Sequence, residues 1–102
     1  MIRHIVLCRF ADTTPEAEIA AIWEALAALQ GVVPGIVEMR FGADVSVEGL
    51  ARGATHAFTV DFEDAAARIG YLAHPAHRAA GERLVAALEG GVEGLVVVDF
   101  LS

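Results

Sequence analysis

The chain has 102 residues and a formal net charge of −7, with seven basic residues, all arginine, against fourteen acidic ones. This length predicts one domain over residues 1–102, built around a single hydrophobic core. The negative charge argues against nucleic acid as a partner, because it repels phosphate backbones. No charge-free apolar stretch approaches the roughly 20 residues of a membrane-spanning helix, and the first residues do not resemble a secretory signal. We therefore expect a cytoplasmic protein that does not bind membranes.

The first half of the chain predicts a strand, a helix and a second strand. Residues 2–10 form a short β-branched run, in which the single cysteine, Cys8, is expected to be buried and inert. A helix should follow, because Thr13 and Glu16 have the spacing of a capping box and apolar residues then recur at helical intervals as far as Leu29. Residues 36–43 alternate between apolar and polar, which predicts the second strand.

The second half predicts a strand, two helices and a last strand. Residues 55–62 alternate in the same way, and Asp64 is placed to cap a short helix that runs through Leu72. Pro75 should end that helix and begin another, which continues to about Leu88. Residues 92–101 supply the last strand. The order βαββαβ predicts the α+β ferredoxin-like fold, a four-stranded antiparallel sheet with its helices on one face.

The two faces of this sheet should be covered differently. Strand parity places His4 and His56 on the side that faces the helices, and Ile5 and Leu7 on the opposite side. Helices cannot cover the second face, although much of it is apolar, so we expect a second copy to cover it. The result would be a homodimer whose two sheets form an α+β barrel. We also expect the first and third strands to run parallel, which would place His4 and His56 side by side.

Residues 71–77, Tyr-Leu-Ala-His-Pro-Ala-His, place a phenol and two imidazoles beside a helix-breaking proline. An acid–base site needs one group that accepts a carbon-bound proton and another that donates to the developing enolate. His77 could accept and Tyr71 could donate, while His4 and His56 orient the ligand. In the alternative, these side chains bond to one another and to the backbone, and serve only to fix the helix break.

Three further residues are candidate ligand contacts, each with a structural alternative. His74 precedes a proline and is expected to cap the following helix. Trp23 lies on the apolar stripe of the first helix, and Phe58 on the inward side of the third strand, so both could belong simply to the core. His74 and His77 have a spacing that metal sites use, but no carboxylate completes the ligand set, and we expect no metal.

Taken together, the motifs resemble the stress-responsive dimeric α+β barrel (Dabb) family over essentially all 102 residues. The resemblance rests on Arg3-His4-Ile5-Val6-Leu7, Pro34-Gly35, Thr55-His56, Phe62-Glu63-Asp64, residues 71–77 and Val98-Asp99-Phe100. It implies a homodimer. The known roles of the family range from stable stress proteins to polyketide cyclisation without a cofactor.

The family's plant polyketide-cyclising member has a catalytic tyrosine and histidine that match Tyr71 and His77. Its supporting strand histidines match His4 and His56, whereas the aromatic lining of its cavity is not matched here. The resemblance therefore implies a small, mostly apolar pocket that binds a hydrophobic or aromatic molecule and requires no cofactor. Two alternatives remain: a cyclase-like lyase that uses Tyr71 and His77, and a purely structural stress protein.

Overall fold

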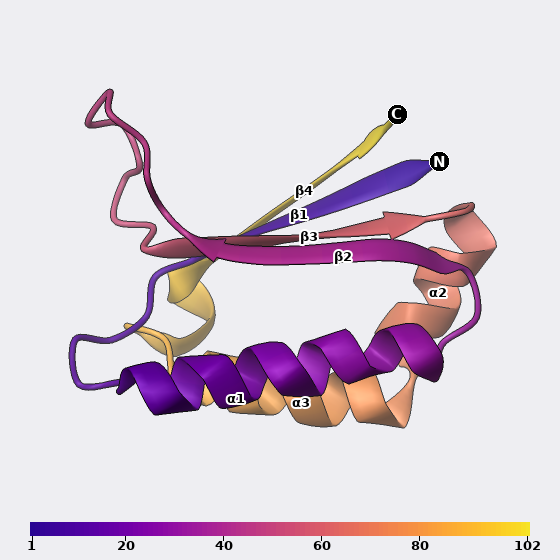
Figure 1. Cartoon of the computed structure of the whole chain (residues 1–102), viewed down its shortest axis with the longest axis horizontal. Helices are drawn as coiled ribbons and strands as arrows, with labels where there is room; N and C mark the ends of the chain where they lie inside the picture. Colours follow the sequence, from indigo (N-terminus) through magenta and orange to yellow (C-terminus); the bar gives the residue numbers. More distant parts are fainter.

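The computed structural model describes all 102 residues and has the expected order of elements. The strands are β1 (Ile2–Cys8), β2 (Ile36–Ala43), β3 (His56–Phe62) and β4 (Leu95–Leu101), and the helices are α1 (Glu16–Ala27), α2 (Ala65–Ala73) and α3 (Pro75–Ala86), with 3-10 turns η1 (Ala28–Gly31) and η2 (Gly91–Gly94). The strands form one antiparallel sheet in the order β2-β3-β1-β4, and the helices lie on one of its faces (Figure 1). This confirms the ferredoxin-like fold. None of the helices has the length and apolar character needed to span a membrane.

The first and third strands run antiparallel, so the expectation of a parallel pair was wrong. The pairing sets His4 opposite Val60, and His56 opposite Cys8. The two histidines are therefore four residues apart along the sheet, about 13 Å at roughly 3.3 Å per residue. The connections explain the direction, because the α1 crossover makes β1 and β2 parallel and the turn before β3 then reverses the chain.

Strand parity correctly predicted which side chains face the helices. Val6 and Cys8 on β1, and Val60 and Phe62 on β3, are buried in one core of seventeen hydrophobic residues. Cys8 is fully buried, and burial raises the pKa of its thiol to about 12. The thiol is therefore protonated at neutral pH and part of the packing, as the sequence suggested.

Both α2 and α3 begin with a side-chain cap. Asp64 accepts a hydrogen bond from the backbone N–H of Ala67 at 2.9 Å, as expected for the first residue before α2. His74 then caps α3, because its Nδ1 accepts from the backbone N–H of Ala76 at 3.0 Å, with Pro75 in the first turn. The break between α2 and α3 is thus fixed by His74 and Pro75.

The capping box expected at the start of α1 is not formed. The helix begins after Pro15, which offers no side-chain cap. The hydroxyl of Thr14 instead donates to the carbonyl oxygen of Ala87 at 2.7 Å, and so ties the start of α1 to the end of α3. The observed first and last strands are also shorter than expected. β1 ends at Cys8, and Phe10 makes only an isolated bridge to Leu88. The 3-10 turn η2 occupies the residues before β4.

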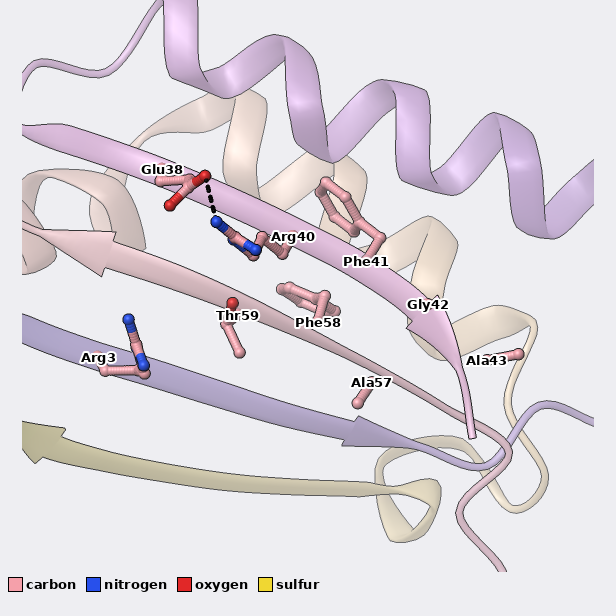
Figure 2. Close-up of a pocket in the computed structure, with 9 residues that line it drawn as sticks. All are labelled: Arg3, Glu38, Arg40, Phe41, Gly42, Ala43, Ala57, Phe58 and Thr59. Carbon is pink, nitrogen blue, oxygen red and sulfur yellow. Dashed lines mark ion pairs between the residues drawn. The ribbon is translucent and has the colours of Figure 1, made fainter. Parts of the chain in front are cut away.

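The outer face of the sheet, away from the helices, has two unlike halves. On β4, the outward side chains Val96, Val98 and Phe100 are 46–54% exposed. A hollow of about 550 Å³ lies over β2 and β3. Figure 2 shows its lining residues and the ion pair between Arg40 and Glu38. The rest of its lining is Arg3, Phe41, Gly42, Ala43, Ala57, Phe58 and Thr59. One half of this face is thus apolar and the other carries charge.

The buried outward carboxylate of Asp61 is paired with Arg3. The guanidinium donates two hydrogen bonds to it, at 2.8 and 3.1 Å, and these lower the pKa of the carboxyl. Asp61 is therefore ionised at neutral pH without leaving a buried charge unpaired.

Candidate functional site

A cavity of about 600 Å³ lies between the sheet and α3, beneath the edge strand β4. Val97 of β4 points inward and lines the cavity, yet its side chain is 53% exposed. The cavity is therefore open to solvent along this edge of the sheet. Apolar groups form most of its wall. The lining residues are His4, Val6, Phe58, Tyr71, Leu72, His77, Arg78, Gly81, Glu82, Leu84, Val85, Leu95, Val97 and Asp99.

Tyr71 and His77 come together because they flank the break between α2 and α3. Tyr71 is in the last turn of α2 and His77 in the first turn of α3, and the centroids of their rings are 4.2 Å apart. Tyr71 is fully buried, and burial raises the pKa of its phenol. Burial also lowers the pKa of His77, and the nearby His4 adds to this shift, whereas the nearby backbone of Leu72 opposes it. At neutral pH we therefore expect a protonated phenol beside a neutral imidazole.

Two polar atoms of this pair are buried and lack a hydrogen-bond partner in the protein: the hydroxyl of Tyr71 and Nδ1 of His77. An unmade hydrogen bond at a buried group costs on the order of 1–3 kcal/mol. Both residues also line the cavity. The unused bonding capacity of the site is thus concentrated in two residues of the cavity wall.

His4 reaches the same cavity from β1 and is held by Asp99 on the neighbouring strand β4. Nδ1 of His4 lies 2.7 Å from Oδ1 of Asp99, and Nη1 of Arg68 donates to Oδ2 at 2.9 Å. Burial acts to raise the pKa of Asp99, but the hydrogen bonds and charges of His4 and Arg68 outweigh it, and the pKa is lowered. The carboxylate is therefore ionised, and His4 donates to it. The ring of His4 lies edge-on to Tyr71, with centroids 6.1 Å apart.

His56 and Trp23 lie away from this cavity, at the other end of the layer between sheet and helices. His56 is edge-on to Phe10 at 5.0 Å, and its Nδ1 is 2.9 Å from the hydroxyl of Thr55. Trp23 packs against the rings of Phe10 and Phe41 at 5.6 and 5.1 Å. The structure thus brings His4, Phe58, Tyr71 and His77 to one cavity and separates them from His56 and Trp23.

His74 is also outside the cavity. Besides capping α3, it lines a separate hollow of about 440 Å³ together with Gly35 and Glu63. Only its residue type and its position between Tyr71 and His77 had suggested His74 as a ligand contact.

Two polar residues of the site, Asp99 and Arg68, were not identified as site residues from the sequence. The sequence did offer a signal for Asp99, because it is the one charged residue in an apolar strand and its parity places it inward. The structure sets it opposite His4. Arg68 carried no such signal. It is a helix arginine whose partner is 31 positions away along the chain.

The topology and the apolar half-face define an α+β barrel subunit of the ferredoxin-like class. A family model described as the stress responsive A/B barrel domain, Dabb, matches residues 2–102, so the chain belongs to this family. This confirms the resemblance that the sequence motifs suggested.

Three relatives indicate what the family contains. The chain is 33% identical to a dimeric ferredoxin-like protein of unknown function from Jannaschia sp. CCS1, with a TM-score of 0.83 and coverage of 99% of this chain and 98% of the other. It is 26% identical to the hydroxynitrile lyase of Passiflora edulis, with a TM-score of 0.87 and coverage of 99% and 92%. It is 27% identical to the olivetolic acid cyclase of Cannabis sativa, over 79% of this chain and 80% of the cyclase.

Proposed function

We propose that the chain binds a small hydrophobic or aromatic molecule that carries a carbonyl group in the cavity beneath β4. The observation that supports this most strongly is the pair of buried, unpartnered polar atoms on Tyr71 and His77 in an otherwise mostly apolar wall. Small-molecule sites typically combine apolar walls with a few convergent polar groups, in cavities of roughly 300–1,000 Å³. The tyrosine hydroxyl would donate to the carbonyl oxygen of the ligand.

Acetophenone is a suitable probe, because it is a small aromatic ketone. Titration followed by amide chemical shifts should give saturable binding with perturbations around Tyr71 and His77. Loss of one hydrogen bond of about 0.5–1.5 kcal/mol corresponds to roughly a two- to tenfold weaker affinity in Tyr71→Phe. His77→Leu should weaken binding as well.

His56→Leu is the matched control, since His56 is a half-buried strand histidine outside the cavity. Its affinity for acetophenone should equal that of the wild type. Equal affinities in all three variants would contradict the proposed site. Failure to bind acetophenone at all, with full retention of the fold, would favour a purely structural stress protein.

Acid–base chemistry on a bound ketone is a second candidate function, supported by the contact between a neutral imidazole and a phenol. Two relatives are named for lyase and cyclase activities. In the step we envisage, His77 removes a proton from the carbon next to the carbonyl. The electron pair of the broken C–H bond forms a C=C double bond, the π pair of the carbonyl moves onto its oxygen, and the enolate accepts a hydrogen bond from Tyr71. Protons and electrons balance with these side chains alone.

Exchange of the methyl protons of acetophenone for deuterium in D2O measures this step directly. The protein should accelerate the exchange, and His77→Leu should reduce the rate to the uncatalysed value while His56→Leu retains it. Saturable binding without accelerated exchange would leave a binding protein and exclude the chemistry for this class of ketone.

We also propose that the chain forms a homodimer through the apolar half of the outer sheet face. Val96, Val98 and Phe100 would lie in the interface, and a solved relative at 33% identity is described as dimeric. Sedimentation should give a dimer at micromolar concentration, and Val98→Asp should give a folded monomer. A wild-type monomer at that concentration would contradict the proposal.

A further inference from the structure

One carboxylate links three elements at the wall of the cavity. Asp99 on β4 accepts from His4 on β1 through one oxygen, at 2.7 Å, and from Arg68 on α2 through the other, at 2.9 Å. His4 is buried, whereas the side chain of Arg68 is 32% exposed. The network therefore runs from the surface to the cavity in two hydrogen bonds.

The position of the proton on His4 depends on this carboxylate. A neutral imidazole carries its proton on either Nδ1 or Nε2, and the hydrogen bond made by one nitrogen decides the state of the other. The titratable groups near His4 are Asp99 from β4, Tyr71 from α2 and His77 from α3, and Arg68 from α2 reaches it only through Asp99. Only Asp99 is an anion, so it alone favours the proton on Nδ1.

The carboxylate can do this only while one oxygen stays directed at His4. Asp99 is on an edge strand beside the opening of the cavity, where a carboxylate held by His4 alone could rotate toward solvent. Arg68 occupies the second oxygen and so fixes the side chain from the other side. The same contact keeps Asp99 ionised.

We propose that Arg68 is a positioning residue, which holds Asp99 so that His4 remains in its Nδ1-protonated tautomer. Nε2 of His4 is then left as a hydrogen-bond acceptor at the wall of the cavity. This extends the proposed function, since it adds a fixed acceptor to the donor supplied by Tyr71. The tautomer itself does not depend on whether any ligand binds.

Nitrogen-15 spectra of the imidazole rings report the tautomer without a ligand, at an alkaline pH where the ring is neutral. In the wild type, His4 should show one protonated and one unprotonated nitrogen, with the proton on Nδ1. In Arg68→Met and Arg68→Gln, the two nitrogen shifts should move toward each other as the second tautomer becomes populated. Arg68→Lys should restore much of the wild-type pattern.

Arg83→Met is the matched control. Arg83 is also a helix arginine paired with a carboxylate, Glu18, at 2.7 and 2.8 Å, but neither residue lines the cavity. This variant should leave the His4 signals unchanged. Asp99→Asn should alter them at least as much as Arg68→Met, which shows that the measurement responds to loss of the carboxylate.

The proposal is overturned if either Arg68→Met or Arg68→Gln, with a native amide spectrum, keeps the wild-type His4 tautomer. A failure of the small-molecule proposal would look different, because it would be seen in the acetophenone titration while the His4 signals still followed Arg68.

Discussion

The layer between sheet and helices contains packed rings at both ends, but the two ends differ in the hydrogen-bonding and packing partners of those rings. At the first end, which we call the aromatic end, Phe10, Trp23, Phe41 and His56 fill the space by packing on one another. At the second, the polar end, Tyr71 and His77 meet a cavity and leave polar atoms unpartnered. Similar residue types thus contribute packing energy at one end and unused hydrogen-bonding capacity at the other.

Truncation at the aromatic end should cause the largest loss of stability. Trp23→Ala removes a ring that contacts three other aromatic side chains, Phe10, Phe41 and Phe58. Because Trp23 is half-buried, we expect a decrease of about 3 kcal/mol in the free energy of unfolding, at the lower end for such truncations. Denaturant unfolding measures this decrease. A loss below 1 kcal/mol would mean that the aromatic end is not a packed core.

Asp99→Asn tests the polar network and should have an intermediate effect. The substitution removes the charge from two hydrogen bonds, and such bonds contribute on the order of 1.5–3 kcal/mol each when made to charged groups. Since Asp99 is partly exposed, we expect a total loss of about 2 kcal/mol, again measured by denaturant unfolding. The pKa of Asp99 is lowered in the fold, so its contribution is present above the usual range near 3.9 and is lost as the pH falls through the lowered value. In the wild type this loss should appear only in strong acid, and it should be absent from Asp99→Asn.

The pH dependence of stability should also reveal His77. Burial lowers the pKa of His77, so the unfolded chain binds a proton at His77 more readily than the folded chain does. Its contribution to the free energy of unfolding is therefore complete above about pH 6.5 and decreases as the pH falls toward the lowered value. His77→Gln should remove this part of the slope in a pH series of unfolding curves. His56→Gln, at the aromatic end, should retain it, and the reverse result would contradict the assignment.

Tyr71→Phe should have the smallest effect on stability. It should weaken ligand binding without lowering the free energy of unfolding, so it distinguishes the two properties most clearly. The hydroxyl has no hydrogen-bond partner in the protein, so its removal leaves no group unsatisfied and relieves a buried one. We expect the free energy of unfolding to be unchanged or to increase by up to about 1 kcal/mol. A decrease of 2 kcal/mol would indicate that the hydroxyl is bonded within the fold and is not available to a ligand.

The sequence predicted the fold well because the patterns that specify it are local. Alternation along residues 36–43 gave β2 at its observed bounds, and Asp64 and His74 cap helices as their positions suggested. The prediction of a capping box before α1 was wrong, because the start of this helix is held by a contact distant in sequence, between Thr14 and Ala87.

The site was predicted in part, because sequence parity gives the face of a side chain but not its neighbours. Tyr71 and His77 are joined by a short turn and could be paired from sequence. Parity places Asp99 inward but does not set it opposite His4, since the two are 95 positions apart and strand register decides which side chains meet. The wrong direction for β1 and β3 brought His56 into the predicted site.

A crystal structure of the protein soaked with para-bromoacetophenone tests the central claim most directly, because the anomalous signal of bromine locates the ligand. We predict a ligand in the cavity beneath β4, with its carbonyl oxygen within hydrogen-bond distance of the Tyr71 hydroxyl. Bromine only at the aromatic end beside Trp23, or a cavity closed by a direct hydrogen bond between Tyr71 and His77, would contradict the account.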